Sequence, residues 1–275
     1  MMSEENKEVP ICPELQIITT SQGDLSLRSC GDGEVIIFLH GLLGSSKAWP
    51  YQFAALSLTY NIIAWDAPGY GKSALIAADI DAYVQMLDEL IQTCGDKKVS
   101  LVGHSMGGTV ASRYAAKNSD KVKCLVLSCT HPGYGAPTTA PISEKLEKRL
   151  KELADIGREA YGWNRARDLL PCPDVPESVL SYAAKIASET NPEGLRRASR
   201  MLQLADNRPL LPKINVPTLI LTGEKDTVVQ PQLQADLLAL VPFTEHIEMP
   251  GLAHAPYLQA PQYYNSLLYD FISKN

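Results

Sequence analysis

The chain has 275 residues, of which 45% are hydrophobic and 20% are charged, and its formal net charge is −6. This composition is that of an ordinary globular protein with a substantial core, and the length suits one α/β domain with an insertion. The acidic balance argues against nucleic acid or an anionic membrane as the main partner. No apolar stretch approaches the roughly 20 residues of a membrane-spanning helix.

The N-terminal stretch and the cysteines indicate the expected cellular location of the protein. The N-terminal stretch MMSEENKEVP is polar and acidic, so it lacks the apolar centre of an export signal. The six cysteines, at positions 12, 30, 94, 124, 129 and 172, form no CxxC pair and no metal-binding cluster. Scattered cysteines in a chain without an export signal are expected to be reduced thiols. We therefore expect a cytoplasmic protein that uses no metal and no other cofactor.

Short apolar runs alternate with helical patterns along the chain, which predicts an α/β fold: a mostly parallel, eight-stranded sheet with helices on both faces. The run VIIFLH at 35–40 is apolar throughout, as is typical of a strand buried on both faces. The first two strands should form a hairpin around Gly23-Asp24. The expected strands are 15–20, 25–28, 35–40, 60–66, 99–103, 122–128, 217–223 and 246–249. The expected core helices are 80–94, 106–117 and 263–272.

Residues 131–211 break this alternation. They open with the Gly/Pro-rich segment HPGYGAPTTAP and then become helical, with further helical pieces around 176–190 and 193–205. An apolar stripe at helical spacing is formed by Leu146, Leu150, Leu153 and Ile156. The segment is far longer than a simple crossover requires. We therefore expect a helical lid at 131–211 on a core made of 1–130 and 212–275; the alternative is a pair of crossover helices with long loops.

The sequence Gly103-His104-Ser105-Met106-Gly107-Gly108 matches the pattern Gly-x-Ser-x-Gly. The pattern is weak alone, but here an expected strand leads into it and an expected helix follows it. Such a sharp turn exposes the hydroxyl of Ser105 and requires Gly103 and Gly107, because side chains there would collide. The start of the helix also points free N–H groups to where negative charge develops. Ser105 is therefore the expected nucleophile.

A serine nucleophile needs a base, usually a histidine that a carboxylate orients, and in this type of sheet the acid precedes the histidine. Among the five histidines, only His254 lies in a Gly/Pro-bounded loop between the last strand and the last helix, at the sheet edge where ligands bind. Asp226, in GEKDT after the strand at 217–223, is the expected acid, and Glu224 is its local alternative. Taken singly, Asp226 could also be a turn or cap residue.

An oxyanion hole should complete the site. The turn His40-Gly41-Leu42-Leu43-Gly44 follows an expected strand, so it brings the backbone N–H of Leu42 to the same sheet edge. The second expected donor is the backbone N–H of Met106, directly after the nucleophile. The loss of one such donor typically costs about 3–4 kcal/mol of transition-state stabilisation.

These motifs resemble those of the α/β-hydrolase superfamily, from about Val35 to the end of the chain. The matching pieces are HGLLGSS, DAPGYGKS, GHSMGG, GEKD and AHAP. The resemblance implies an α/β-hydrolase fold, and it implies that DAPGYG, at 66–71, is a structural turn. The chain is similar to enol-lactonases (especially over 191–225), carboxylesterases and carbon–carbon hydrolases of aromatic degradation. Its HGLLGSS loop departs from the Ser/Gly/Pro-rich oxyanion loop of the carbon–carbon hydrolases.

We therefore expect a serine hydrolase that cleaves a small-molecule ester or lactone through an acyl-serine intermediate, without nucleic-acid or membrane partners. Two alternatives stay open, namely a carbon–carbon hydrolase of aromatic ring-cleavage products and a non-turnover ligand-binding member of the fold. The oligomeric state has no signal in the sequence. The lid offers candidate apolar lining from Tyr161, Trp163, Leu169, Leu170 and Met201. Candidate anchors for a substrate carboxylate are Arg196, Arg197 and Arg200.

Overall fold

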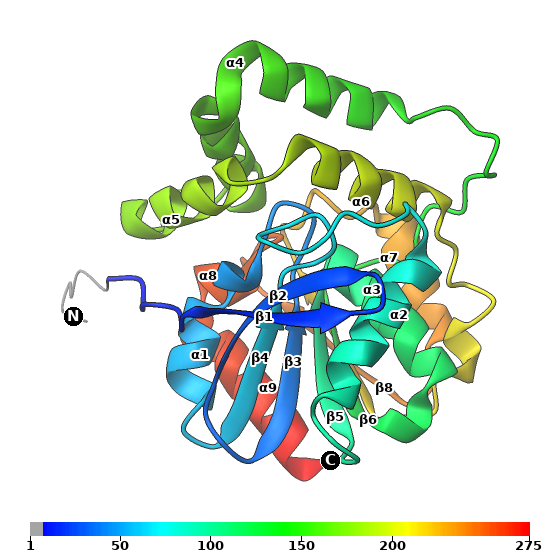
Figure 1. Cartoon of the computed structure of the whole chain (residues 1–275). Coiled ribbons are helices and arrows are strands. Elements are labelled where there is room, and N and C mark those ends of the chain that lie inside the picture. The colour runs from blue at the N-terminus through cyan, green and yellow to red at the C-terminus, as the bar shows by residue number, and fades with distance from the viewer. Residues whose placement is uncertain (1–7) are drawn as a thin grey trace.

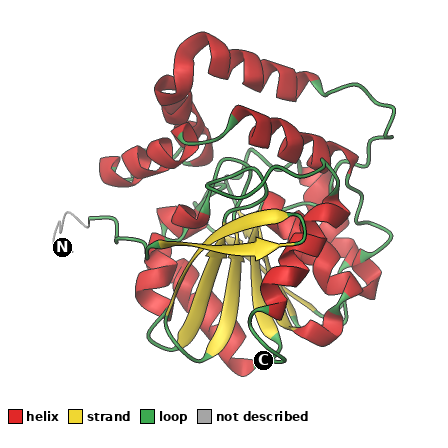
Figure 2. Cartoon of the chain, in the orientation of Figure 1, coloured by secondary structure: helices red, strands yellow, loops and turns green. Residues whose placement is uncertain are grey.

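A central sheet of eight strands organises the protein (Figures 1 and 2). The computed structural model describes residues 8–275; residues 1–7, which carry most of the polar N-terminal stretch, lie outside the described residues. The strand order is β1-β2-β4-β3-β5-β6-β7-β8. The pairs from β4 to β8 are parallel, whereas β1 with β2 and β2 with β4 are antiparallel. This confirms the expected mostly parallel, eight-stranded sheet.

The strands begin and end close to their expected positions. They are β1 (Leu15–Thr20), β2 (Gly23–Cys30), β3 (Glu34–Leu39), β4 (Tyr60–Trp65), β5 (Val99–His104), β6 (Val122–Ser128), β7 (Thr218–Gly223) and β8 (Thr244–Met249). The expected hairpin joins β1 to β2, with Thr20 opposite Gly23. Gly23 has a φ of 113°, a backbone conformation that glycine adopts without steric cost. The hairpin and β8 are the two edges of the sheet, so the parallel strands between them are buried.

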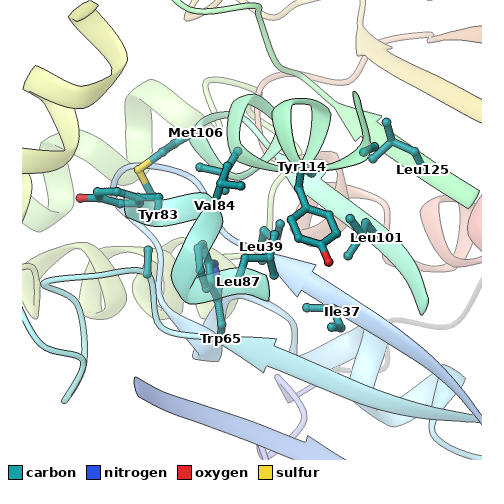
Figure 3. Close-up of a cluster of buried hydrophobic side chains, with 14 of the residues drawn as sticks. Ile37, Leu39, Trp65, Tyr83, Val84, Leu87, Leu101, Met106, Tyr114 and Leu125 are labelled. Atoms are coloured by element: carbon teal, nitrogen blue, oxygen red, sulfur yellow. The ribbon is translucent and has the colours of Figure 1, made fainter. Parts of the chain in front are cut away.

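Helices cover both faces of the sheet, as expected. One face carries α1 (Pro50–Leu56), α8 (Pro256–Gln259) and α9 (Pro261–Lys274), and the other carries α2 (Ile80–Gln92), α3 (Met106–Lys117) and α7 (Pro231–Leu240). Side chains of β3 alternate between two cores: Ile37 and Leu39 face α2 and α3, whereas Ile36 and Phe38 face α1 and α9. Figure 3 shows the first core, where Tyr83 of α2 lies near Met106 of α3. Helices α1, α7 and α8 were not predicted from the sequence.

The segment between β6 and β7 contains three helices, α4 (Glu144–Leu169), α5 (Glu177–Ser188) and α6 (Pro192–Leu204). They lie together above the sheet in Figure 1. A small apolar cluster joins the three helices to the loop after β3; it consists of Leu43, Leu153, Tyr161, Ala187 and Leu195. We propose that this segment, within residues 131–211, is a lid on a core made of 1–130 and 212–275.

The first helix of this segment is bent where the expected apolar stripe ends. Gly157 has φ 78° and ψ 168°, which interrupts the helical geometry of α4. Leu146 and Leu153 are buried, but Ile156 is 43% exposed. The non-helical residue interrupts the 3.6-residue period, so the stripe does not continue beyond Ile156.

Two general expectations concern membranes and thiols. Across residues 8–275, none of the helices combines the length and the apolar character that crossing a membrane requires. The six cysteines are free thiols, and Cys124 and Cys129 are buried beside the central strands, as expected.

Candidate active site

Ser105 lies at the turn between β5 and α3 in a strained backbone conformation. Its φ of 51° and ψ of −117° fall outside the regions that non-glycine residues favour, which costs about 1–3 kcal/mol. Hydrogen bonds hold it there: its N–H donates to the carbonyl of Ser128 at 3.0 Å, and its carbonyl accepts from the N–H of Gly108 at 2.9 Å. The hydroxyl of Thr130 also donates to that carbonyl, at 2.5 Å. Such an over-determined, strained serine is typical of an exposed nucleophile on a sharp turn.

Two glycines make this turn possible for the reason expected from the sequence. A Cβ on Gly103 would lie 2.6 Å from the backbone carbonyl oxygen of Gly107. A Cβ on Gly107 would lie 2.1 Å from the carbonyl oxygen of Leu39 on the neighbouring strand. Both contacts are with backbone atoms, which cannot move without disturbing the sheet, so larger residues are excluded.

His254 and Asp226 form a buried hydrogen-bonded pair. The Nδ1–H of His254 donates to Oδ2 of Asp226 at 2.9 Å, and the two side chains are 3% and 4% exposed. The other oxygen of Asp226 accepts the N–H groups of Val228 at 2.8 Å and Val229 at 3.2 Å. Burial alone would raise the pKa of Asp226, but the hydrogen bond and charge of His254, followed by the two backbone donors, hold that pKa below its ordinary value. The carboxylate therefore stays ionised and fixes the proton of His254 on Nδ1.

The alternative acid, Glu224, faces a different partner. Its Oε2 accepts the backbone N–H of Gly251 at 2.6 Å, and the residue is exposed. Glu224 thus supports the loop that carries His254, whereas Asp226 contacts the imidazole directly.

A cavity of about 340 Å³ brings the expected nucleophile and base together, because Ser105 and His254 both line it. Leu42, from the loop after β3, and Val228, beside Asp226, contribute to the same wall. The hydroxyl of Ser105 has no hydrogen-bond partner within the part of the chain that the structure describes, so its contact with His254 Nε2 stays a prediction. In ligand-free enzymes such contacts are often long.

Hydrogen bonds of the His40 side chain stabilise the loop that is expected to form the oxyanion hole. The Nε2 of His40 accepts the N–H of Ala67 at 2.9 Å, and its Nδ1–H donates to the carbonyl of Gly41 at 2.7 Å. This bonding needs a neutral imidazole, and burial lowers the pKa of His40 accordingly. The buried turn DAPGYG thus has the structural role implied by the resemblance, since Ala67 belongs to it.

A hydrogen bond from Tyr70 also stabilises this loop. Its hydroxyl donates to the carbonyl of Leu42 at 2.6 Å, which orients the peptide unit next to the cavity. Among the described residues the N–H groups of Leu42 and Met106 have no hydrogen-bond partner. Leu42 lines the cavity and Met106 directly follows Ser105, so both N–H groups are candidates to stabilise a negative charge that develops beside Ser105.

His104 supports the other side of the base. Its Nε2–H donates to the backbone carbonyl of His254 at 2.7 Å, and the two imidazole rings lie 4.8 Å apart, centroid to centroid. Burial, followed by the proximity of His254, lowers the pKa of His104 to about 3. A neutral His104 thus positions the backbone of the base without adding charge to the site.

One group of potential metal ligands coincides with this site. Donor atoms of Cys129, Asp226 and His254 all lie within 4.8 Å of one another. Burial, followed by the charge of Asp226, raises the pKa of the Cys129 thiol well above its ordinary value, which disfavours the thiolate that binds metals. An ion here would also compete with the hydrogen bond between Asp226 and His254.

The structure changes the expected substrate contacts. Leu169 lines the cavity, but Tyr161, Leu170 and Met201 are buried in the packing between segment and core. Trp163 packs at the edge of the core, with the guanidinium of Arg167 over its ring. Four of the five residues proposed as lining therefore stabilise the fold, because apolar residues at helical spacing serve packing first.

The three expected arginine anchors also have other partners. Arg196 and Arg197 pair with Glu193, and Arg200 donates to the carbonyls of Thr138 and Pro141. The cations that do line the cavity are Lys145 and Arg149 of α4, which were not predicted from the sequence as substrate contacts. The sequence pattern that could have identified them is their four-residue spacing, which places both on one side of the helix, next to the apolar Leu146.

Comparisons with known proteins identify the family. The sequence model described as "alpha/beta hydrolase fold" matches residues 34–261. A pimeloyl-[acyl-carrier protein] methyl ester esterase of Vibrio vulnificus is 27% identical over 256 residues, covering 91% of this chain and 99% of that protein. The corresponding esterase of Chromobacterium violaceum is also 27% identical, over 87% of this chain and 94% of its own length.

Solved structures share the fold at lower identity. The enol-lactonase of Burkholderia xenovorans LB400 has a TM-score of 0.83 at 21% identity, covering 94% of this chain and 100% of that one. The esterase EaEST of Exiguobacterium antarcticum has a TM-score of 0.84 at 22% identity, covering 94% of this chain and 98% of that one. Since the family model spans most of the chain and the sheet carries the strained serine, this chain belongs to the alpha/beta hydrolase fold family.

Proposed function

We propose that this protein hydrolyses a small-molecule ester or lactone through an acyl-serine intermediate, with Ser105, His254 and Asp226 as its catalytic triad. The reaction class is that of an ester-bond hydrolase, in agreement with relatives named as methyl ester esterases and as an enol-lactonase. The observation that carries the proposal is the buried Asp226–His254 hydrogen bond opening onto the same cavity as the strained Ser105.

In the acylation half, the hydroxyl oxygen of Ser105 attacks the carbonyl carbon while Nε2 of His254 accepts the hydroxyl proton. Asp226 keeps the imidazole in the required tautomer and stabilises the imidazolium. The tetrahedral oxyanion accepts hydrogen bonds from the N–H groups of Leu42 and Met106, close to the positive end of α3. His254 then returns its proton to the leaving alcohol or enol oxygen, and the carbon–oxygen bond breaks.

In the deacylation half, water replaces the alcohol. His254 takes a proton from the water as its oxygen attacks the acyl-serine carbonyl, and the same two N–H groups stabilise the second oxyanion. Collapse of this intermediate returns the proton to Ser105 and releases the carboxylic acid. Each step uses groups of this chain and water alone. The cytoplasmic location expected from the reduced thiols belongs to the same proposal.

The first test is active-site labelling with a fluorophosphonate probe. The wild-type protein should be labelled once, at Ser105 by peptide mass analysis, and Ser105→Ala should not be labelled. Ser100→Ala is the matched control: it lies on the same strand, β5, outside the cavity, and should be labelled normally. A folded wild-type protein that resists labelling would favour the non-turnover, ligand-binding alternative.

The second test is substrate turnover. A chain-length series of p-nitrophenyl esters and small lactones should be hydrolysed with burst kinetics, which report the accumulating acyl-enzyme. Vinylogous diketones, assayed by product analysis, probe the carbon–carbon hydrolase alternative. Cleavage of the diketones without ester hydrolysis would contradict the proposed reaction.

A further inference from the structure

The cavity has an unusual distribution of charge. The charged lysine and arginine side chains that line it are Lys145 and Arg149, one helical turn apart on α4, and none of its lining residues is an aspartate or a glutamate. The protein as a whole carries a formal net charge of −6. The positive charge of this cavity in an otherwise acidic protein therefore needs an explanation.

Several other cations of the α4–α6 segment have acidic partners, although Arg158 and Lys185, which do not line the cavity, form no ion pair within residues 8–275. Arg165 pairs with Glu152 and Asp168, Lys148 with Glu144, and Lys151 with Asp155. Within residues 8–275, neither Lys145 nor Arg149 forms an ion pair or a hydrogen bond. Lys145 is exposed and Arg149 is half-buried, so water can solvate both charges, and both remain free to pair with an anion that enters the cavity.

The two cations line the cavity from the same helix, and their charges influence the groups around them. Partial burial, followed by the charge of Arg149, lowers the pKa of Lys145. Burial, then His254, then Lys145 lower the pKa of His131, which lines the same cavity, to about 4. Burial raises the pKa of Tyr134, and the charge of Arg149 opposes this shift. The fields of both cations thus reach the lining of the cavity.

A polar group without a partner lines the same cavity. The hydroxyl oxygen of Ser199, on α6, is buried, has no hydrogen-bond partner and lines the cavity. A buried hydroxyl that lacks a partner is destabilising, so such groups usually meet a ligand or water. Ser199 and the two cations therefore form a set of donors suited to oxygen atoms of an anion.

This set of donors is separate from the reacting atoms. In Figure 1 α6 lies between α4 and the sheet, and Ser105 lies at the end of a sheet strand. We propose that Lys145, Arg149 and Ser199 bind a carboxylate at the far end of the substrate from the scissile ester. The proposal rests on the proposed function at Ser105 and narrows its substrate class to esters or lactones that carry a second, anionic carboxylate.

The test compares monomethyl with dimethyl esters of linear dicarboxylic acids of increasing length. The two esters of one acid differ only in the distal charge. We expect kcat/KM to favour the monomethyl ester at one chain length, mainly through a lower KM. In the double variant Lys145→Gln/Arg149→Gln, the ratio of the two kcat/KM values should fall about 10- to 100-fold, as charged hydrogen bonds would give. Added salt should lower the ratio for the wild-type protein.

The matched control is Lys148→Gln/Lys151→Gln, which removes two charges from the exposed side of the same helix. It should keep the wild-type ratio. If the control and the cavity variant change the ratio equally, or if the wild-type protein does not distinguish the esters, the carboxylate site is refuted. In either case hydrolysis of the dimethyl ester would still support the proposed function.

Binding separates the two proposals when turnover is absent. In Ser105→Ala, calorimetry with the monomethyl ester should give a Kd that rises at least 10-fold when Lys145→Gln/Arg149→Gln is added. Binding that depends on the cations in a protein without esterase activity would support the carboxylate site and refute the proposed reaction. An unchanged Kd would refute the carboxylate site.

Discussion

Replacement of Asp226 by asparagine tests the site most directly, because the structure determines how the amide must sit. One side-chain oxygen accepts two backbone N–H groups, from Val228 and Val229, and the other faces Nδ1 of His254. An asparagine keeps the two backbone bonds only if its oxygen takes the first place. Its NH₂ group then points at Nδ1 and can donate only to an imidazole whose proton has moved to Nε2.

That tautomer has lost the lone pair that accepts the proton of Ser105. We expect kcat to fall about 10⁴-fold in Asp226→Asn, as is typical for a triad with the wrong tautomer. Since a factor of ten in rate is about 1.4 kcal/mol, this is a loss of about 5.5 kcal/mol of transition-state stabilisation. The free energy of unfolding should change far less, by about 1–2 kcal/mol, because the amide keeps its hydrogen bonds.

The assay is pre-steady-state hydrolysis of a p-nitrophenyl ester, with urea denaturation of the same samples. Glu224→Gln is the matched control: it removes the other acid of the loop, whose carboxylate accepts a backbone N–H of Gly251 instead. It should retain activity within a few-fold. Full activity in Asp226→Asn, with loss in Glu224→Gln, would refute the assignment of the acid.

Three further outcomes are expected. Gly107→Ala should lose at least about 3 kcal/mol of stability, measured by urea unfolding, because its Cβ would lie 2.1 Å from a strand carbonyl oxygen. Tyr70→Phe removes the hydrogen bond to the carbonyl of Leu42, so kcat/KM should fall about 10-fold while the melting temperature stays nearly unchanged. A kcat/KM equal to that of the wild-type protein would refute the role of Tyr70 in positioning this loop. Burial and the nearby His254 lower the folded-state pKa values of His104 and His131 to about 3 and about 4, below the unfolded value near 6.5. The unfolded chain therefore binds more protons than the folded protein below pH 6.5. The free energy of unfolding should be highest above pH 6.5 and should fall toward pH 4 by up to about 1.4 kcal/mol per pH unit for each histidine. A urea midpoint that does not change between pH 7.5 and 5 would contradict this.

Local sequence determined the elements of the core because their signals are local. A strand buried on both faces needs a continuous apolar run, as in β3, and a turn as tight as the one at Ser105 needs Gly103 and Gly107 whatever surrounds it. Chain order and the position of each loop at a strand end were also enough to bring Asp226 and His254 together as candidates. Short helices such as α8 were missed because four residues carry too little periodicity to stand out.

Tertiary structure decided which side chains meet the cavity. An apolar stripe shows that a helix face is buried, but it does not show whether that face meets the core or a ligand, and so Tyr161 and Met201 turned out to be packing residues. The same holds for charge: Arg197 satisfies Glu193 four residues away, whereas Lys145 and Arg149 find no acid and line the cavity. The proposed triad residues could be predicted from the sequence because their chemistry restricts where they can lie, whereas substrate contacts depend on how α4 and α6 pack over the sheet.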